Sequence, residues 1–181
     1  MIDDDPNPEA LAEQALQAYS RSEYANALRL FTTAREGFQS LDQKRRAAEM
    51  SNNICVCLLE LNRAQEALAA VEDTPTVFRE TGERLLEAQA YGNRAMASAV
   101  LGRSDAAQRD YRSAARLFRD LGDEEGLQYT MQALSKLQLE AGQPMQALDS
   151  MQSAMGSRKR RSWRDRMLSW LFNLPRRLFG R

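Results

Sequence analysis

The sequence contains no histidine, which removes the most common general base and the most common metal ligand. It has only two cysteines, Cys55 and Cys57, which lie close together in a segment predicted to be helical. Residues two positions apart point in different directions from a helix, so we expect neither a disulfide nor a shared metal ion. We predict that both thiols pack in the core, which fits a reducing cytoplasm.

Long apolar runs are also missing. No apolar stretch is long enough to cross a bilayer, so no membrane-spanning helix is expected. Residues 1–8 are acidic and contain two prolines, which predicts a flexible acidic leader rather than a secretion signal. The chain has no glycine-rich phosphate loop and no nucleophile motif. We therefore expect no enzymatic activity, no cofactor, no metal ion and no small-molecule substrate.

Basic residues are outnumbered by acidic ones in the body of the chain and are concentrated at its end. Lysine plus arginine and aspartate plus glutamate each total 25, so the formal net charge is zero. The segment 158–181, however, holds nine of the basic groups and a single acid, Asp165. An acidic body with a basic tail suggests that the tail has a partner of its own.

A regular alternation of small and bulky residues is present, and it is clearest at 91–118. This stretch predicts two amphipathic helices joined by a tight turn, with Gly102 ending the first helix and Ser104 as the N-cap of the second. The alternation recurs with a period of about 40 residues, hereafter one repeat. It gives small residues at Ala27, Ala67, Ala107 and Ala147 and at Ala15, Cys55, Ala95 and Ser135, aromatic residues at Phe38, Phe78 and Phe118, bulky residues at Phe31, Val71, Tyr111 and Met151, and turn formers at Ser22, Asn62, Gly102 and Gly142. This recurrence predicts an array of helical hairpins, each burying its apolar face on the next.

Helix ends follow from the same pattern. The predicted helices are 8–20, 23–40, 43–61, 64–81, 124–140 and 144–156, in addition to the pair within 83–122. Asp42 and Asp123 are expected N-caps, and Pro144 suits a first helical turn. Pro75 falls inside a helix, so we expect a kink or break between residues 72 and 76.

This pattern resembles the tetratricopeptide repeat (TPR). Its consensus positions are matched by Leu11, Ala15, Tyr24, Ala27, Phe31 and Ala34, and again by Tyr91, Ala95, Gly102, Ala107, Tyr111 and Ala114. The period of about 40 residues exceeds the usual length of about 34 residues and is similar to the long repeats of kinesin light chain and of polarity adaptors. Ser104 and Ala64 replace an aromatic residue, and Arg94 stands where leucine is common.

The resemblance implies an all-α fold, a right-handed superhelical solenoid of four TPR-like helix hairpins followed by a C-terminal amphipathic helix. The hairpins would span 9–42, 43–82, 83–122 and 123–156, and the basic amphipathic tail 157–181.

In this family the first helix of each repeat lines a concave groove that binds peptides or helices. The candidate groove residues, hereafter the ladder, are Leu16, Tyr19, Asn52, Asn53, Asn93, Met96, Gln132 and Lys136. Asn53 and Asn93 match the position at which related repeats hold a peptide backbone, and an amide offers both a donor and an acceptor. Alternatively, these asparagines bond only to neighbouring helices. With Lys136 as its one basic residue, the ladder favours an apolar or basic segment over a C-terminal carboxylate.

The tail combines basic residues with one apolar stripe. Its candidate membrane-binding or partner-binding residues are Arg158, Lys159, Arg160, Arg161, Trp163, Arg164, Met167, Trp170, Leu171, Leu174 and Leu178. Pro175 is expected to end the main helix near Leu174. The composition is typical of a helix that lies in an anionic membrane interface. The tail could instead cap the last repeat, enter a groove of a partner protein or fold into its own array; nucleic acid is a weaker option, because a duplex has no use for an apolar face.

The sequence thus predicts a non-enzymatic, cytoplasmic adaptor or scaffold. The array would bind a segment of another protein, and the tail would attach the complex peripherally to the cytoplasmic face of a membrane. The alternative is a soluble assembly factor or complex subunit whose C-terminal helix docks into a partner or into its own groove.

Overall fold

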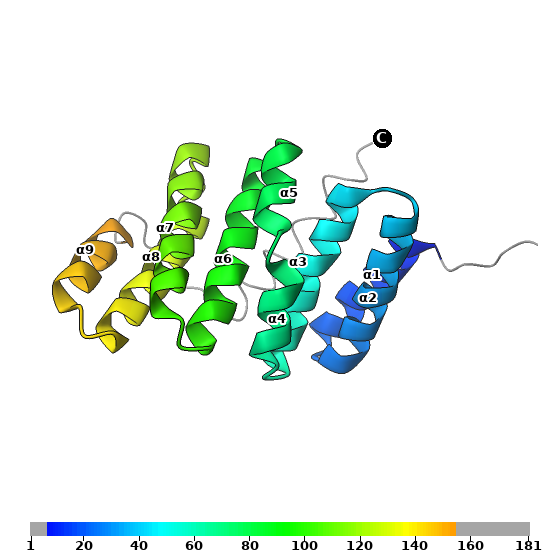
Figure 1. Cartoon of the computed structure of the whole chain (residues 1–181), viewed down its shortest axis with the longest axis horizontal. Coiled ribbons are helices and arrows are strands. Elements are labelled where there is room, and N and C mark those ends of the chain that lie inside the picture. Colours follow the sequence, from blue (N-terminus) through cyan, green and yellow to red (C-terminus); the bar gives the residue numbers. More distant parts are fainter. Residues whose placement is uncertain (1–6, 155–181) are drawn as a thin grey trace, which may run out of the picture.

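The protein is a row of α-helices that pack one after another. The structure, a computed structural model, describes residues 7–154; the predicted tail and residues 1–6 of the predicted leader lie outside this range. Its elements are α1 (Pro8–Ser20), α2 (Tyr24–Ser40), α3 (Lys44–Glu60), α4 (Ala64–Val71), α5 (Thr74–Glu80), α6 (Arg84–Val100), α7 (Ser104–Leu121), α8 (Glu124–Glu140) and α9 (Pro144–Ala154). They follow the long axis in sequence order, from α1 and α2 at the right to α9 at the left (Figure 1). The predicted all-α repeat solenoid is confirmed.

One left-handed residue lies in each tight turn of the described range. These residues are Ser22, Asp42, Asn62, Gly82, Gly102, Gly122 and Gly142, with φ between 54° and 77°. They are evenly spaced along the chain, two to each repeat. Glycine adopts this conformation at no steric cost, whereas serine, aspartate and asparagine adopt it with some strain. The turn, rather than the length of any helix, therefore sets the repeat.

Two of the predicted N-caps are wrong for the same reason. The turns before α3 and α7 are only three residues long, and in both the residue after the left-handed one already occupies the N-cap position. Gln43 therefore precedes α3 and Arg103 precedes α7, while Asp42 is itself left-handed and Ser104 is already helical. The N-cap at Asp123 is confirmed, because its side chain accepts a hydrogen bond from the Gly126 N–H at 2.9 Å.

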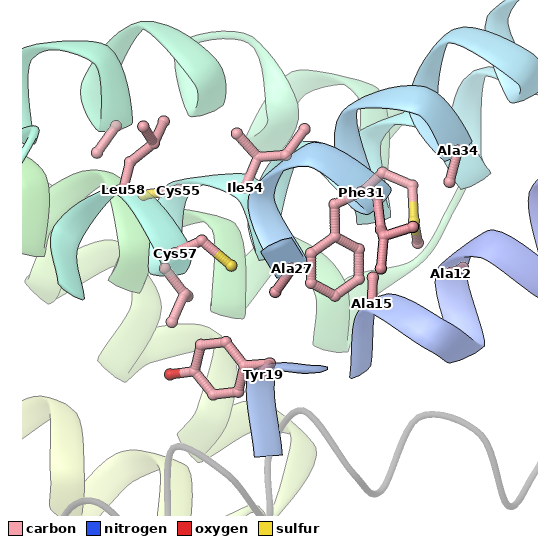
Figure 2. Close-up of a cluster of buried hydrophobic side chains, with 14 of the residues drawn as sticks. Ala12, Ala15, Tyr19, Ala27, Phe31, Ala34, Ile54, Cys55, Cys57 and Leu58 are labelled. Atoms are coloured by element: carbon pink, nitrogen blue, oxygen red, sulfur yellow. The ribbon is translucent and has the colours of Figure 1, made fainter. Parts of the chain in front are cut away.

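The predicted small residues lie in the seam between the helices of each hairpin. Ala27, Ala67, Ala107 and Ala147 are fully buried, as are Ala15, Cys55 and Ala95. In the first hairpin, Ala15 of α1 and Ala27 of α2 lie close to the Phe31 ring (Figure 2). Burial raises the pKa of the Cys55 and Cys57 thiols to about 12, and both are free. Their packing role is confirmed.

The equivalent phenylalanines Phe38, Phe78 and Phe118 are also fully buried. The groups that pack against the Phe38 and Phe118 rings differ. The guanidinium of Arg46 lies 4.7 Å from the centroid of the Phe38 ring. At the equivalent place beside Phe118 is Gly126, where an added Cβ would lie 2.6 Å from the ring. Glycine is therefore required there for α8 to approach α7 so closely.

The helix break predicted near Pro75 is confirmed. Two carbonyl groups that lose their helical hydrogen bonds at the break accept hydrogen bonds from other groups instead. α4 ends at Val71 and α5 begins at Thr74. Pro75 has no N–H to donate to the Val71 carbonyl, and the Thr74 hydroxyl donates to that oxygen instead, at 3.0 Å. The next carbonyl, of Glu72, accepts from Nη1 of Arg94 at 2.8 Å.

Arg94, which stands where the TPR pattern favours leucine, joins three helices. Besides the Glu72 carbonyl at the end of α4, its Nε and Nη2 donate to both carboxylate oxygens of Asp110 in α7, each at 2.8 Å. Its guanidinium also lies 5.3 Å from the centroid of the Tyr91 ring. Such bidentate contacts are strong and directional, so this arginine fixes α6 against α7 and against the break.

We predict that Ala27→Leu destabilises the protein by about 1–3 kcal/mol, because the seam has no room for a larger side chain. Ala25 lies on the exposed side of the same helix, so Ala25→Leu should leave the free energy of unfolding nearly unchanged. Urea denaturation of both variants measures the difference. Equal midpoints would show that close packing of this seam does not stabilise the hairpin.

We predict that Arg94→Met costs about 2 kcal/mol or more, because it leaves the half-buried Asp110 carboxylate and the Glu72 carbonyl without their partner. The control is Arg84→Met, which removes an exposed ion pair with Asp120 and should cost below about 1 kcal/mol. Thermal and urea unfolding compare the two variants. A loss for Arg94→Met no larger than for Arg84→Met would contradict the proposed role.

Candidate functional site

The ladder is carried by α1, α3, α6 and α8, the first helices of the successive hairpins. α3, α6 and α8 begin at Lys44, Arg84 and Glu124, so they share one register. Because the turns keep this register, residues that lie one repeat apart occupy the same turn of successive first helices. The ladder is therefore a set of equivalent positions repeated along the solenoid.

Four of the ladder residues in α1, α3 and α6 differ in solvent exposure. Leu16, Asn53 and Met96 are half-buried. Tyr19 is buried, and its ring lies against that of Tyr24, with 5.3 Å between centroids. Figure 2 shows Tyr19 at the border of the buried cluster of the first two hairpins. This end of the ladder thus offers mostly apolar side chains and one amide.

Asn52 and Asn93 are both buried, and both lie near neighbouring helices. The side-chain oxygen of Asn52 lies 3.3 Å from the Thr74 hydroxyl at the start of α5. The main-chain oxygen of Asn93 accepts from the Cys55 thiol at 3.9 Å. The Asn52 side chain thus lies against a neighbouring helix, whereas the alternative interpretation concerned Asn53 and Asn93 and stays a prediction for both.

The last two ladder residues, Gln132 and Lys136, are exposed on α8. The Nζ atom of Lys136 lies 3.8 Å from a carboxylate oxygen of Glu140, one helical turn away. Exposed pairs of this kind hold their partners weakly. The ladder therefore changes from apolar and partly buried on α1 to polar and accessible on α8.

A charged cluster that the sequence reasoning missed connects the first three hairpins. Glu49 of α3 pairs with Arg45 and lies 3.8 Å from Arg46, which also approaches Glu9 of α1 at 3.9 Å. Arg45 in turn lies 3.8 Å from Glu83, just before α6. Burial raises the pKa of the Glu49 carboxyl, while the two arginines act in the opposite direction. Glu9 and Glu49 lie one repeat apart, and this shared register was the available signal.

No metal centre or spanning helix accompanies this surface between residues 7 and 154. No group of three or more cysteine, aspartate or glutamate side chains is arranged there to hold a metal ion. Likewise, none of the helices in this range is both long and apolar enough to cross a membrane. The predicted tail residues, Arg158 to Leu178, lie outside the range.

Comparisons with known proteins agree with the architecture. A family model described as "Soluble NSF attachment protein, SNAP" matches residues 5–157. No curated protein matches the chain significantly. Among solved structures, BtubC (BKLC) from P. vanneervenii is 16% identical with a TM-score of 0.75, and the match covers 86% of this chain and 68% of that one. A Rap protein complexed with competence and sporulation factor is 19% identical with a TM-score of 0.73, covering 99% of this chain and 50% of that one.

A putative kinesin light chain from Podospora anserina, with nearly identical TPR-like repeats, is 12% identical with a TM-score of 0.71, and the match covers 95% of this chain and 91% of that one. At such identities the likeness concerns the fold alone. This chain spans only half of the Rap protein. The resemblance to TPR proteins with long repeats is confirmed. Since the family model extends over residues 5–157, this chain belongs to the soluble NSF attachment protein (SNAP) family, whose members are built from TPR-like helical repeats.

Proposed function

We propose that this protein is a non-enzymatic adaptor that holds a segment of another protein against the ladder. The observation that carries the proposal is the register of the first helices, which repeats equivalent positions along α1, α3, α6 and α8. A surface of this kind suits a long, narrow ligand, because each hairpin can contact the next part of it. A similar fold occurs in a Rap protein that was crystallised with competence and sporulation factor.

The chemistry of the ladder favours a segment with apolar side chains. Leu16 and Met96 offer half-buried apolar surface, and methionine adapts its shape to different partners. Asn53 and Gln132 can donate to or accept from a peptide group in either chain direction. The bound segment would therefore be an extended peptide or an amphipathic helix, with its backbone or polar side near the amides.

The first test removes the two accessible amides in the full-length chain, as Asn53→Ala with Gln132→Ala. We expect recovery of co-purifying partner proteins to fall roughly tenfold, since each lost hydrogen bond contributes about 0.5–1.5 kcal/mol. The matched control is Gln39→Ala with Gln146→Ala, which removes two exposed amides from α2 and α9. Quantitative mass spectrometry of pull-downs compares both variants with the parent. Equal recovery from the two double variants would refute binding at the ladder.

For the tail, we propose attachment to an anionic membrane surface. The segment 157–181 contains both tryptophans of the chain, a leucine-rich stripe and nine basic groups. Tryptophan rings favour the headgroup region, and each basic group near an anionic leaflet contributes about 1 kcal/mol. Both contributions together would hold the adaptor reversibly at a membrane surface.

The second test measures flotation of the full-length protein with phosphatidylserine-containing vesicles. Charge reversal in the tail, Arg160→Glu with Arg161→Glu, should lower recovery at least tenfold, because it replaces attraction by repulsion. The control reverses two exposed arginines of α7, Arg116→Glu with Arg119→Glu, and should float like the parent. If the parent does not float, or if the tail variant floats equally well, membrane attachment is refuted and the assembly-factor alternative is favoured.

A further inference from the structure

The last described helix, α9, carries an apolar face that its counterparts in earlier hairpins bury. α2 packs against α3, α4 and α5 pack against α6, and α7 packs against α8. Within residues 7–154 no helix follows α9. Met145, Leu148 and Met151 are accordingly 73%, 48% and 48% exposed. Because three positions separate each from the next, these side chains lie on one side of the helix.

Met151 indicates that this face of α9 is a packing surface without a helix against it in the described part of the chain. Its equivalents in the earlier repeats are Phe31, Val71 and Tyr111, all of which are at most 4% exposed. Phe31 shares a buried cluster with side chains of α3, and Tyr111 shares one with side chains of α8, which are the first helices of the following hairpins. Met151 therefore occupies a core position of the solenoid without the cover that the fold normally supplies.

The register specifies which residues should supply that cover. If the spacing of the turns continued beyond the described residues, the next left-handed residue would be Ser162, a serine like Ser22, and the next first helix would begin at Arg164. The tail has apolar residues at Met167, Trp170, Leu171, Leu174 and Leu178, which are equivalent to Ala47, Met50, Ser51, Ile54 and Leu58 of α3. All five of these α3 residues are buried. The tail thus carries its apolar stripe in the register of a core-facing first helix.

Two further residues bear on this register. Asn173 lies a whole number of repeats after Asn53 and Asn93, so the same register would extend the amide position of the ladder into the tail. Pro175 falls where Cys55 and Ala95 stand, and a proline there ends a helix early. The cover should therefore be short, ending near Leu174. The separation in sequence between Pro144 and Arg164 equals that between Ser104 and Glu124, so the connection is long enough.

We propose that residues 164–174 form the first helix of a fifth, incomplete hairpin and dock through their apolar stripe on α9. The docked helix would turn Trp170 and Leu171 toward Met151, as Met50 and Ser51 are turned into the core. Since one stripe cannot contact α9 and lipid at once, docking would oppose the membrane attachment proposed above. The inference concerns the protein without lipid, so it stands or falls independently of that function.

Tryptophan fluorescence tests the docking in the full-length chain, because both tryptophans lie in the tail. Trp163→Phe leaves Trp170 as the single reporter. In lipid-free solution we expect blue-shifted Trp170 emission that acrylamide quenches poorly. Adding Met151→Glu should place a charge in the interface, shift the emission to longer wavelengths and raise quenching to that of the unfolded chain. Gln152→Glu is the matched control, since Gln152 is exposed on the same helix and its α7 equivalent, Arg112, is exposed too.

Three results would overturn the proposal. The first is full quenching of Trp170 already in the Trp163→Phe protein, and the second is an equal effect of Met151→Glu and Gln152→Glu. The third is a blue shift that disappears on dilution, which would indicate a second copy of the chain on α9. Far-ultraviolet circular dichroism and thermal melting of each variant establish that the array itself is intact, which is expected because Met151 and Gln152 are both exposed.

Discussion

The structure depends on a backbone constraint, one left-handed residue in each of the two- or three-residue turns between the described helices. This residue reverses the chain so tightly that the end of one helix and the start of the next share a connection, as when the Arg103 N–H donates to the Ser98 carbonyl at 2.9 Å. Because the chain reverses in a similar way at each turn, equivalent helices are rotated alike about their own axes. The same sequence positions therefore face each seam, which is why the equivalent alanines and phenylalanines are fully buried.

Residues that repeat could be predicted from the sequence, because periodicity averages over many side chains. The helix ranges, the seam alanines and the break at Pro75 all depend on pattern or on a local property of one residue. The N-caps at Asp42 and Ser104 failed, because aspartate and serine favour several turn positions and the spacing alone does not say which one they take. Arg94 was visible as a departure from the TPR pattern, but its contact with Asp110 lies within its own hairpin and its contact with Glu72 reaches the preceding one, and no repeat predicts either.

The candidate site was predictable to a smaller extent. Register alone places the ladder residues on four equivalent helices, but it says nothing about how deep each side chain lies. Asn52 is buried and lies 3.3 Å from Thr74 at the break between α4 and α5, whereas Gln132, at the equivalent position of α8, is exposed. The charged cluster around Glu49 likewise requires three hairpins to meet. A repeat protein can thus have a regular backbone and an irregular surface, and the surface determines which ligand is recognised.

The even spacing of the turns also restricts how such an array can change in length. One inserted residue rotates the following part of a helix by about 100° and moves its apolar side away from the seam. Loops can often absorb such an insertion, but these short connections have no slack. We therefore expect viable variants of the fold to gain or lose complete helix-and-turn units. Duplication of a unit keeps the seams packed, whereas stepwise insertion of single residues does not.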